Sequence, residues 1–230
     1  MRRLLRALEV PLLVLTPLVL GICAYVQFDQ AALLTVLVAV VTVVVFLASY
    51  EASRPGLRQV VPTVVLAALA AAGRILFAAV PDFKPVTAVC IIAGVALGRR
   101  EGFMTGALAA LVSNIFFGQG LWTAWQMYSW GLVGYLSGVL ADHGAFRRRL
   151  VLYVFGFVSA LLYGFVLNSW FIVGYVRPVT WSTALAAYAA GLPWDCTHGA
   201  ATVIFLLALY LPWQRKLERI KRKFALADLG

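Results

Sequence analysis

Asp195 and His198 are the pair whose residue types and spacing come closest to reaction chemistry in this sequence. Residues three apart lie side by side on a helix, so the carboxylate and the imidazole would be neighbours. Three roles are open: capping of a helix start by Asp195 with a local hydrogen bond to His198, contact with a ligand, or catalysis. A catalytic Zn²⁺ usually needs three protein ligands, so the pair is incomplete as a metal site. We keep both residues as candidate ligand contacts and predict neither a catalytic residue nor a bound metal.

Arg74 is a basic residue inside an otherwise apolar stretch, residues 60–80. A charge at the centre of a membrane span costs about 2.5–3.5 kcal/mol on insertion scales, so it needs a partner or a route to water. Its guanidinium could snorkel to the outer interface or form a structural ion pair. Alternatively, it faces a cavity that opens outward and holds an acidic or amide-bearing ligand, which a planar guanidinium suits well.

Polar and aromatic side chains gather around two breaks in the apolar pattern, at residues 81–85 and 118–126. Aromatic residues at this depth are typical of the belt at a membrane interface. Their mixture with amides also fits a pocket with apolar walls and a few orienting hydrogen bonds. A long outer segment, 168–193, could cover such a pocket. Besides Arg74, Asp195 and His198, the candidate substrate-binding residues are Lys84, Asn114, Gln119, Trp122, Trp125, Gln126 and Trp130.

Small residues recur at intervals of three or four in three parts of the chain. Helices in lipid associate by close packing, which small residues permit. Ala67 and Ala71 form a flat strip within residues 60–80. Packing within one bundle and docking of a separate membrane subunit on the alanine strip are both open. The glycines with this spacing are Gly94, Gly98, Gly102 and Gly106, then Gly131, Gly134 and Gly138.

The sequence lacks the motifs that are typical of several classes of function. Neither the G-x-x-x-x-G-K-[ST] pattern nor a G-x-G-x-x-G after a strand occurs, so ATP hydrolysis must come from other chains and we expect no cofactor. Cys23, Cys90 and Cys196 form no CxxC pair, which argues against a disulfide framework or a thiolate metal site. No line of carboxylates and histidines crosses the apolar runs, so proton-driven coupling by this chain alone is not expected.

The amino-acid composition indicates a membrane protein. With 63% apolar and only 12% charged residues, the chain has too little polar surface to coat a soluble domain. Apolar runs of about 20 residues cross a bilayer as helices, because lipid offers the backbone no hydrogen-bond partners. We therefore predict an all-α, polytopic helix bundle. Its eight spans are 10–28, 31–50, 60–80, 86–97, two within 102–141, 150–167 and 196–212.

The positions of the basic residues predict the orientation of these spans. A net charge of +10 would suggest nucleic acid in a soluble protein, but here the charges gather at alternate ends of the apolar runs. With the N-terminus in the cytoplasm, only Lys84 and Arg177 lie outside and Arg74 within a span. We predict a multi-pass protein of the cell membrane with both termini cytoplasmic. Its basic C-terminal residues then meet lipid headgroups or a cytoplasmic partner, and no nucleic acid.

A polar linker at 51–56, which ends in Pro55-Gly56, divides the chain. Residues 1–56 comprise two plain apolar spans and this linker, residues 57–213 a six-helix substrate-binding core, and residues 214–230 a basic cytoplasmic tail. The first two spans contain no intramembrane charge, which suits an appendage that faces lipid or a partner. We assign no chemistry to them.

Short motifs of the core resemble those of the substrate-binding S component of an energy-coupling factor (ECF) vitamin importer. The resemblance covers about residues 60–223 and is closest to the cobalamin-type branch through the Gly-Gln-Gly-Leu-Trp-Thr segment at 118–123. The motifs are Phe83-Lys84-Pro85-Val86-Thr87-Ala88-Val89, Gly94 with Gly98, Gly102-Phe103 with Gly106-Ala107, Ser113-Asn114, 117–123, Trp125-Gln126-Met127, and Gly191-Leu192-Pro193-Trp194-Asp195 with His198.

The resemblance implies a six-helix membrane subunit that captures a vitamin from outside, cobalamin in this branch. It also implies two kinds of partner, a transmembrane coupling protein and two cytoplasmic ATPases, and it matches Ala67 and Ala71 to the AxxxA docking motif of the family. The two extra N-terminal spans depart from the six-helix plan. Two other functions stay open: a lipid-processing membrane enzyme that uses Asp195 and His198, and an assembly partner that binds no small molecule.

Overall fold

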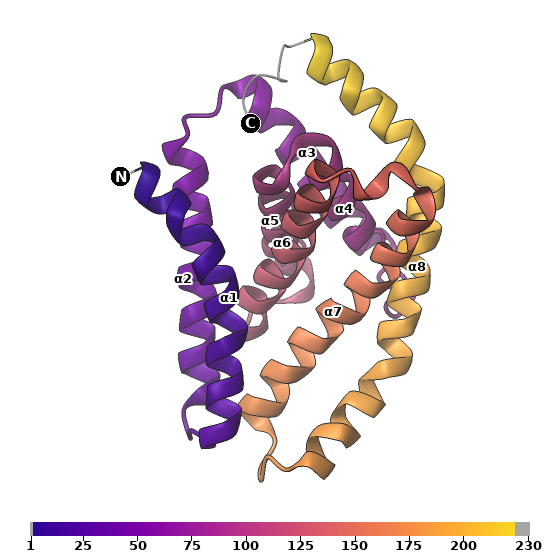
Figure 1. Cartoon of the computed structure of the whole chain (residues 1–230). Helices are drawn as coiled ribbons and strands as arrows, with labels where there is room; N and C mark the ends of the chain where they lie inside the picture. Colours follow the sequence, from indigo (N-terminus) through magenta and orange to yellow (C-terminus); the bar gives the residue numbers. More distant parts are fainter. Residues whose placement is uncertain (1, 224–230) are drawn as a thin grey trace.

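The computed structural model describes residues 2–223, which fold into eight α-helices and one short 3₁₀ helix (Figure 1). The predicted all-helical class is confirmed. Five helices, α1, α2, α3, α7 and α8, are long and apolar enough to cross a membrane. The elements are α1 (Arg2–Val26), α2 (Ala31–Ala52), α3 (Leu57–Leu76), α4 (Val86–Leu97), α5 (Arg99–Phe117), α6 (Leu121–Asp142), η1 (Ala145–Arg147), α7 (Arg149–Tyr175) and α8 (Trp181–Lys223).

Helix α4 does not match the span predicted at residues 86–97. Its 12 residues are too few, because a rise of about 1.5 Å per residue gives about 18 Å against a hydrocarbon core of about 30 Å. Ten of these residues are buried, and α3, α5, α6 and α8 all pack against the helix. The continuous apolar sequence of α4 therefore reflects its place in the centre of the bundle and not exposure to lipid.

Helices α7 and α8 occupy the region predicted to be a long outer segment. Only residues 176–180 separate them, so the expectation of a cover formed by 168–193 is wrong. Pro193 lies inside α8, which membrane helices tolerate when neighbours satisfy the freed backbone groups. Asp195 is consequently in a helix interior and is not an N-cap. Helix α8 also continues through residues 214–223 of the predicted tail, and residues 224–230 lie outside the described residues.

Successive helices run in alternating directions, which gathers their connections at two ends of the bundle (Figure 1). We call the basic end the one that holds the start of α1, the α2–α3 linker, the α4–α5 turn and the last turns of α8. The amide end holds the α1–α2, α3–α4, α5–α6 and α7–α8 connections. At the basic end Gly98 alone separates α4 from α5. Its φ of +116° is readily adopted only by glycine and permits this abrupt reversal.

Helices α1 and α2 form a hairpin that packs along one side of the other helices (Figure 1). The Phe46 ring of α2 stacks on Phe103 of α5, with 3.8 Å between ring centroids. The Tyr128 hydroxyl of α6 donates a hydrogen bond to the Leu13 carbonyl oxygen of α1 at 2.7 Å. Because Phe46, Phe103 and Tyr128 are all buried, the hairpin is part of the packed core, contrary to the expectation of an appendage.

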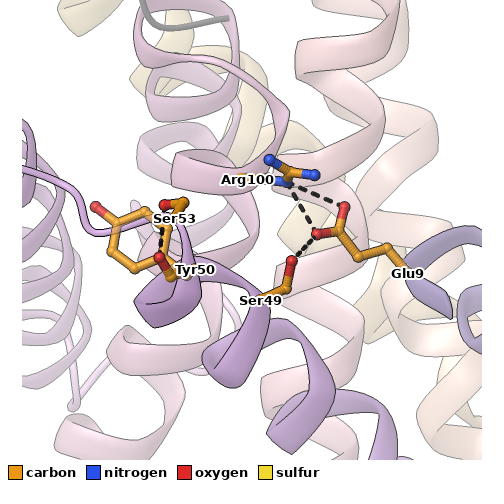
Figure 2. Close-up of polar contacts among 5 residues, drawn as sticks. All are labelled: Glu9, Ser49, Tyr50, Ser53 and Arg100. Atoms are coloured by element: carbon orange, nitrogen blue, oxygen red, sulfur yellow. Dashed lines mark hydrogen bonds and ion pairs between the residues drawn. The ribbon is translucent and has the colours of Figure 1, made fainter. Parts of the chain in front are cut away.

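Glu9 joins this hairpin to α5 at the basic end (Figure 2). Its carboxylate accepts a hydrogen bond from the Ser49 hydroxyl of α2 and pairs with Arg100 Nε at 2.9 Å. Glu9 is only 4% exposed, and a buried carboxylate is tolerated when it is both paired and hydrogen-bonded. The sequence contains no local sign of this contact, since Arg100 lies 91 residues away from Glu9.

The alanine strip of α3 faces the interior of the chain. Ala67 and Ala71 are 3% and 2% exposed, and α3 packs on α4 and α5. The expectation of an open docking strip at these two residues is therefore not met, because other helices of the same chain already cover them. The exposed side of α3 carries Ala68 and Ala72 instead.

Candidate functional site

Arg74 is the centre of a polar network at the amide end. Its Nη1 donates hydrogen bonds to Ser113 Oγ and Asn114 Oδ1, each at 2.6 Å. The guanidinium carbon lies 4.6 Å from the ring centroid of Phe117 and 5.0 Å from that of Trp130. Two oxygen acceptors and two aromatic faces thus stabilise the charge. The guanidinium thus points into the bundle and, among the described residues, forms no ion pair with a carboxylate. The alternative of a ligand held in a cavity that opens outward stays a prediction.

Asn114 links Arg74 to the connection between α5 and α6. Its side chain is fully buried, and its Nδ2 donates to Thr123 Oγ1 at 3.0 Å and to Gln126 Oε1 at 2.7 Å. The Thr123 hydroxyl in turn donates to Gln119 Oε1 at 2.9 Å. An amide offers one oxygen acceptor and two N–H donors, so these contacts fix which way the Asn114 amide points.

Trp130 extends the network from α6 to α4, α7 and α8. Its Nε1 donates to Thr87 Oγ1 at 3.0 Å, and Thr87 Oγ1 lies 2.8 Å from His198 Nε2. A threonine hydroxyl can accept a bond from the indole and donate one to the imidazole at the same time. Tyr163 stacks on Trp130 with 4.5 Å between centroids and meets His198 edge-on at 5.4 Å. These four side chains therefore connect four different helices.

Asp82 and Lys84 lie in the α3–α4 connection beside this network. Burial raises the pKa of the Asp82 carboxyl, and the charges of Lys84 and Arg74 oppose that change. Burial likewise lowers the pKa of Lys84, which the charge of Asp82 opposes. Lys84 Nζ donates to the carbonyl oxygens of Phe77 and Val80, at 2.9 and 2.8 Å. Lys84 thus satisfies backbone carbonyl oxygens just after α3 and, among the described residues, does not hydrogen-bond to the network.

The three tryptophans predicted as pocket walls lie in three different environments. Trp130 belongs to the network. Trp125 is fully buried on the face of α6 that also carries Tyr128, the residue bonded to α1. Trp122 is 43% exposed, and its ring lies against Gly120. Helix periodicity explains the division, because residues 123, 126 and 130 share one face of α6 whereas 125 and 128 lie on the opposite face.

Asp195 and His198 form hydrogen bonds with different helices. Asp195 Oδ2 accepts a hydrogen bond from Asn168 Nδ2 of α7 at 3.4 Å, and the carboxylate packs where a Cβ on Gly164 would collide with it. His198 is 5% exposed and contacts Thr87 of α4. The two residues lie on adjacent turns of α8, yet one ties α8 to α7 and the other ties it to α4.

Five residues of the network were not among the predicted site residues: Ser113, Phe117, Thr123, Thr87 and Tyr163. Ser113 and Thr123 adjoin predicted positions, and Phe117 and Thr87 lie in the 117–123 and 83–89 segments that carried the family resemblance, so a sequence signal existed for four of them. Tyr163 had none. It is one of many aromatic residues in α7, and only its stacking on Trp130 distinguishes it.

The network therefore combines one cation, two side-chain amides, several hydroxyls and the faces of Trp130 and Tyr163. Side chains of these kinds can stack on a planar molecule and hydrogen-bond to its rim, but in this structure Trp130 and Tyr163 stack on each other. Gln119, Asn114 and Gln126 supply the amide oxygens and N–H groups. The arrangement is suited to binding.

A family model for the "ECF-type riboflavin transporter, S component" matches residues 56–215. The matched range includes α3 to α7 and α8 as far as residue 215, and excludes α1 and α2. The matching family is of the riboflavin type, so the expected cobalamin-type branch is not supported. Neither a curated protein nor a solved structure matches the chain significantly.

Proposed function

The chain belongs to the family of ECF-type riboflavin transporter S components, and from this premise we propose that it binds riboflavin in the network around Arg74, Asn114 and Trp130. Members of this family are integral membrane subunits of a transporter and not enzymes, which leaves no role for Asp195 and His198 in lipid processing. The observation that carries the proposal is the junction of a buried amide network with a stacked aromatic pair.

The chemistry of the flavin fits this junction. Its tricyclic ring is planar and stacks well on an indole or phenol face. One edge of that ring alternates carbonyl acceptors with an N–H donor, which side-chain amides such as those of Asn114 and Gln126 can match, and Arg74 can donate to either carbonyl. The hydroxyls of the ribityl chain can exchange bonds with Thr123 and Gln119.

Binding requires the network to exchange partners. Arg74, Asn114 and Gln126 are hydrogen-bonded to one another or to Ser113 and Thr123 in the present structure. A ligand that replaces these internal bonds with bonds of its own leaves no buried polar group unsatisfied, so the exchange carries little enthalpic penalty. Displacement of Gln126 and movement of the 118–120 connection would open the site from the amide end.

Riboflavin binding to the purified full-length chain tests the proposal. Flavin fluorescence is expected to fall on binding, because stacking on Trp130 and Tyr163 quenches it. Asn114→Ala and Gln126→Ala should each weaken affinity about tenfold or more, since each removes a desolvated hydrogen bond worth about 1–3 kcal/mol. Trp181→Ala is the matched control, because Trp181 lies at the same end and is 86% exposed.

Three readouts separate the outcomes. Thermal unfolding of each variant checks that lost affinity does not come from lost fold. Cobalamin, added as a competitor, should leave the riboflavin signal unchanged. Failure of the wild-type chain to bind riboflavin would reject the substrate, and tight binding by both amide variants would reject the site.

We also propose that the coupling protein of the transporter docks on the exposed side of α3. That side borders an apolar groove of about 530 Å³ between α3 and the last turns of α8. The groove is lined by Val61, Val65 and Leu69 from α3 and by Trp213 and Leu217 from α8. Its apolar character and the exposed alanines beside it suit close packing of another membrane helix.

A further inference from the structure

A second cavity, of about 400 Å³, lies at the basic end between the N-terminal hairpin and the remaining helices. Four separate segments bring basic side chains to it: α1, the α2–α3 linker, the start of α5 and the end of α8. Two acidic residues, Glu101 and Asp142, also line it. The basic residues of its wall are Arg2, Arg6, Arg54, Arg99, Arg100 and Lys221.

The charge of this cavity is not balanced by its own acidic residues. Six cationic residues face two acidic ones, and one of the six, Arg100, pairs with the buried Glu9, which lies outside the wall (Figure 2). Cations gathered around one cavity repel one another, and a bound anion relieves this repulsion. The N-terminus of α5 begins at Arg99 and adds the positive end of a helix dipole to the same place.

Tyr50 provides a second, independent indication of a ligand. It lines the same cavity and is 9% exposed, and its hydroxyl interacts with Thr63 but forms no hydrogen bond of standard geometry with the described residues. An acceptor oxygen from a ligand would complete the bonding of this buried hydroxyl. Figure 2 shows Tyr50 beside Ser53, which also lines the cavity.

We propose that this cavity binds a phosphate-bearing anion. The planar guanidinium forks of arginine match the oxygens of a phosphate group, and the volume lies in the range of about 300–1,000 Å³ that is usual for small-molecule sites. The phosphate can belong to a soluble metabolite or to the headgroup of an anionic phospholipid. Because the hairpin supplies Arg2, Arg6 and Tyr50, the site gives a role to the two helices that lie outside the family match.

Pyrophosphate and anionic lipid test the two sources separately on the full-length chain. In one arm, the protein in nanodiscs of phosphatidylcholine is titrated with inorganic pyrophosphate, and binding is measured by calorimetry. In the other arm, phosphatidylglycerol replaces part of the lipid, and the thermal unfolding midpoint is recorded. We expect a saturable heat of binding in the first arm, a raised midpoint in the second, or both.

The double substitution Arg54→Gln with Arg99→Gln should weaken the response at least about tenfold, because it removes two charge-assisted hydrogen bonds to phosphate, the stronger class of hydrogen bond. Tyr50→Phe removes one hydroxyl and should weaken it several-fold, which keeps a test available if the double variant folds poorly. The matched control, Arg147→Gln with Arg148→Gln, removes two charges at the same end outside the cavity and should change nothing.

The outcomes decide the proposal in both directions. A response to pyrophosphate that the double variant loses identifies a soluble phosphate ligand, and a response confined to phosphatidylglycerol identifies a lipid headgroup. A wild-type chain that responds to neither probe overturns the proposal. Equal losses in the cavity variant and in the control variant would also overturn it, because they would trace binding to the general positive charge of this end.

Discussion

Single buried side chains at the amide end are held by bonds that cross from helix to helix. Thr87 is the clearest case, since it is fully buried and meets both Trp130 Nε1 and His198 Nε2. Lipid provides no substitute partner for either ring nitrogen, so this hydroxyl satisfies two groups that would otherwise be unpaired.

Thr87→Val should lower the free energy of unfolding by about 1–3 kcal/mol, because it preserves shape and leaves two buried ring nitrogens without the hydroxyl. Thermal or denaturant-induced unfolding of the protein in detergent measures the change. Thr105→Val is the control, since Thr105 is equally buried and its hydroxyl bonds only to the Glu101 carbonyl oxygen of its own helix. Equal effects of the two substitutions would contradict the bridging role.

At the residue scale the sequence predicted Arg74, Asn114, Gln119, Gln126, Trp130 and His198 as site residues, and the structure brings these six into one connected network. It separates Lys84, Trp122, Trp125 and Asp195 from the hydrogen bonds of that network. Residue type and depth alone could not make this division, because it depends on which face of a helix each side chain occupies. Whether the network binds substrate stays a prediction.

Among the elements, α4, α5 and α6 approach one another most closely, at glycines. A Cβ on Gly134 would collide with the Gly102 backbone, and one on Gly94 with the Gly134 carbonyl oxygen and Ser137. These glycines thus serve close packing within one bundle, as predicted. The close approach positions the ends of α5 and α6, and with them the site residues Asn114 and Gln126.

Gly134→Ala should destabilise the protein by about 1–3 kcal/mol, because the added methyl group cannot fit without moving the backbone of α5. The same substitution should weaken riboflavin binding, since it displaces α6. Gly21→Ala in α1 is the matched control. No atom lies within 4 Å of a Cβ at Gly21, so its unfolding midpoint should be unchanged or slightly raised. A Gly134→Ala variant as stable as the wild type would contradict the crossing.

Over the whole molecule, the two ends of the bundle differ in chemistry. The amide end has a largely uncharged network around one arginine, whereas the basic end combines a cationic cavity with the Glu9–Arg100 pair. From the positive-inside rule we predict that the basic end lies in the cytoplasm and the amide end outside. Capture of a vitamin from the exterior requires this orientation.

Accessibility of single cysteines measures that orientation. In a chain whose three native cysteines are replaced by alanine, a membrane-impermeant maleimide should label Asp29→Cys in intact cells, because residue 29 lies in the α1–α2 connection. His143→Cys, between α6 and η1, should react only after the membrane is permeabilised. Labelling in the reverse order would refute the assignment of the amide end to the exterior.

What the sequence determined by itself follows from composition and local pattern. Apolar runs predict membrane helices, because lipid leaves the backbone no other hydrogen-bonded structure. The predicted linker at 51–56 lies just before α3. The core motifs indicated the S-component family, which the family model shows. These properties depend on residues close together in the chain, which is why they could be read without a structure.

Tertiary structure alone decided the remaining features. That α4 is a buried core helix, that the N-terminal hairpin is packed and tied by Glu9 to Arg100, and that Ala67 and Ala71 face inward all depend on contacts between distant segments. An apolar side chain satisfies lipid and protein interior almost equally, so hydrophobicity cannot tell which of the two surrounds it. Only the packing of helix against helix makes that distinction, and it is this packing that assembles both the amide network and the basic cavity.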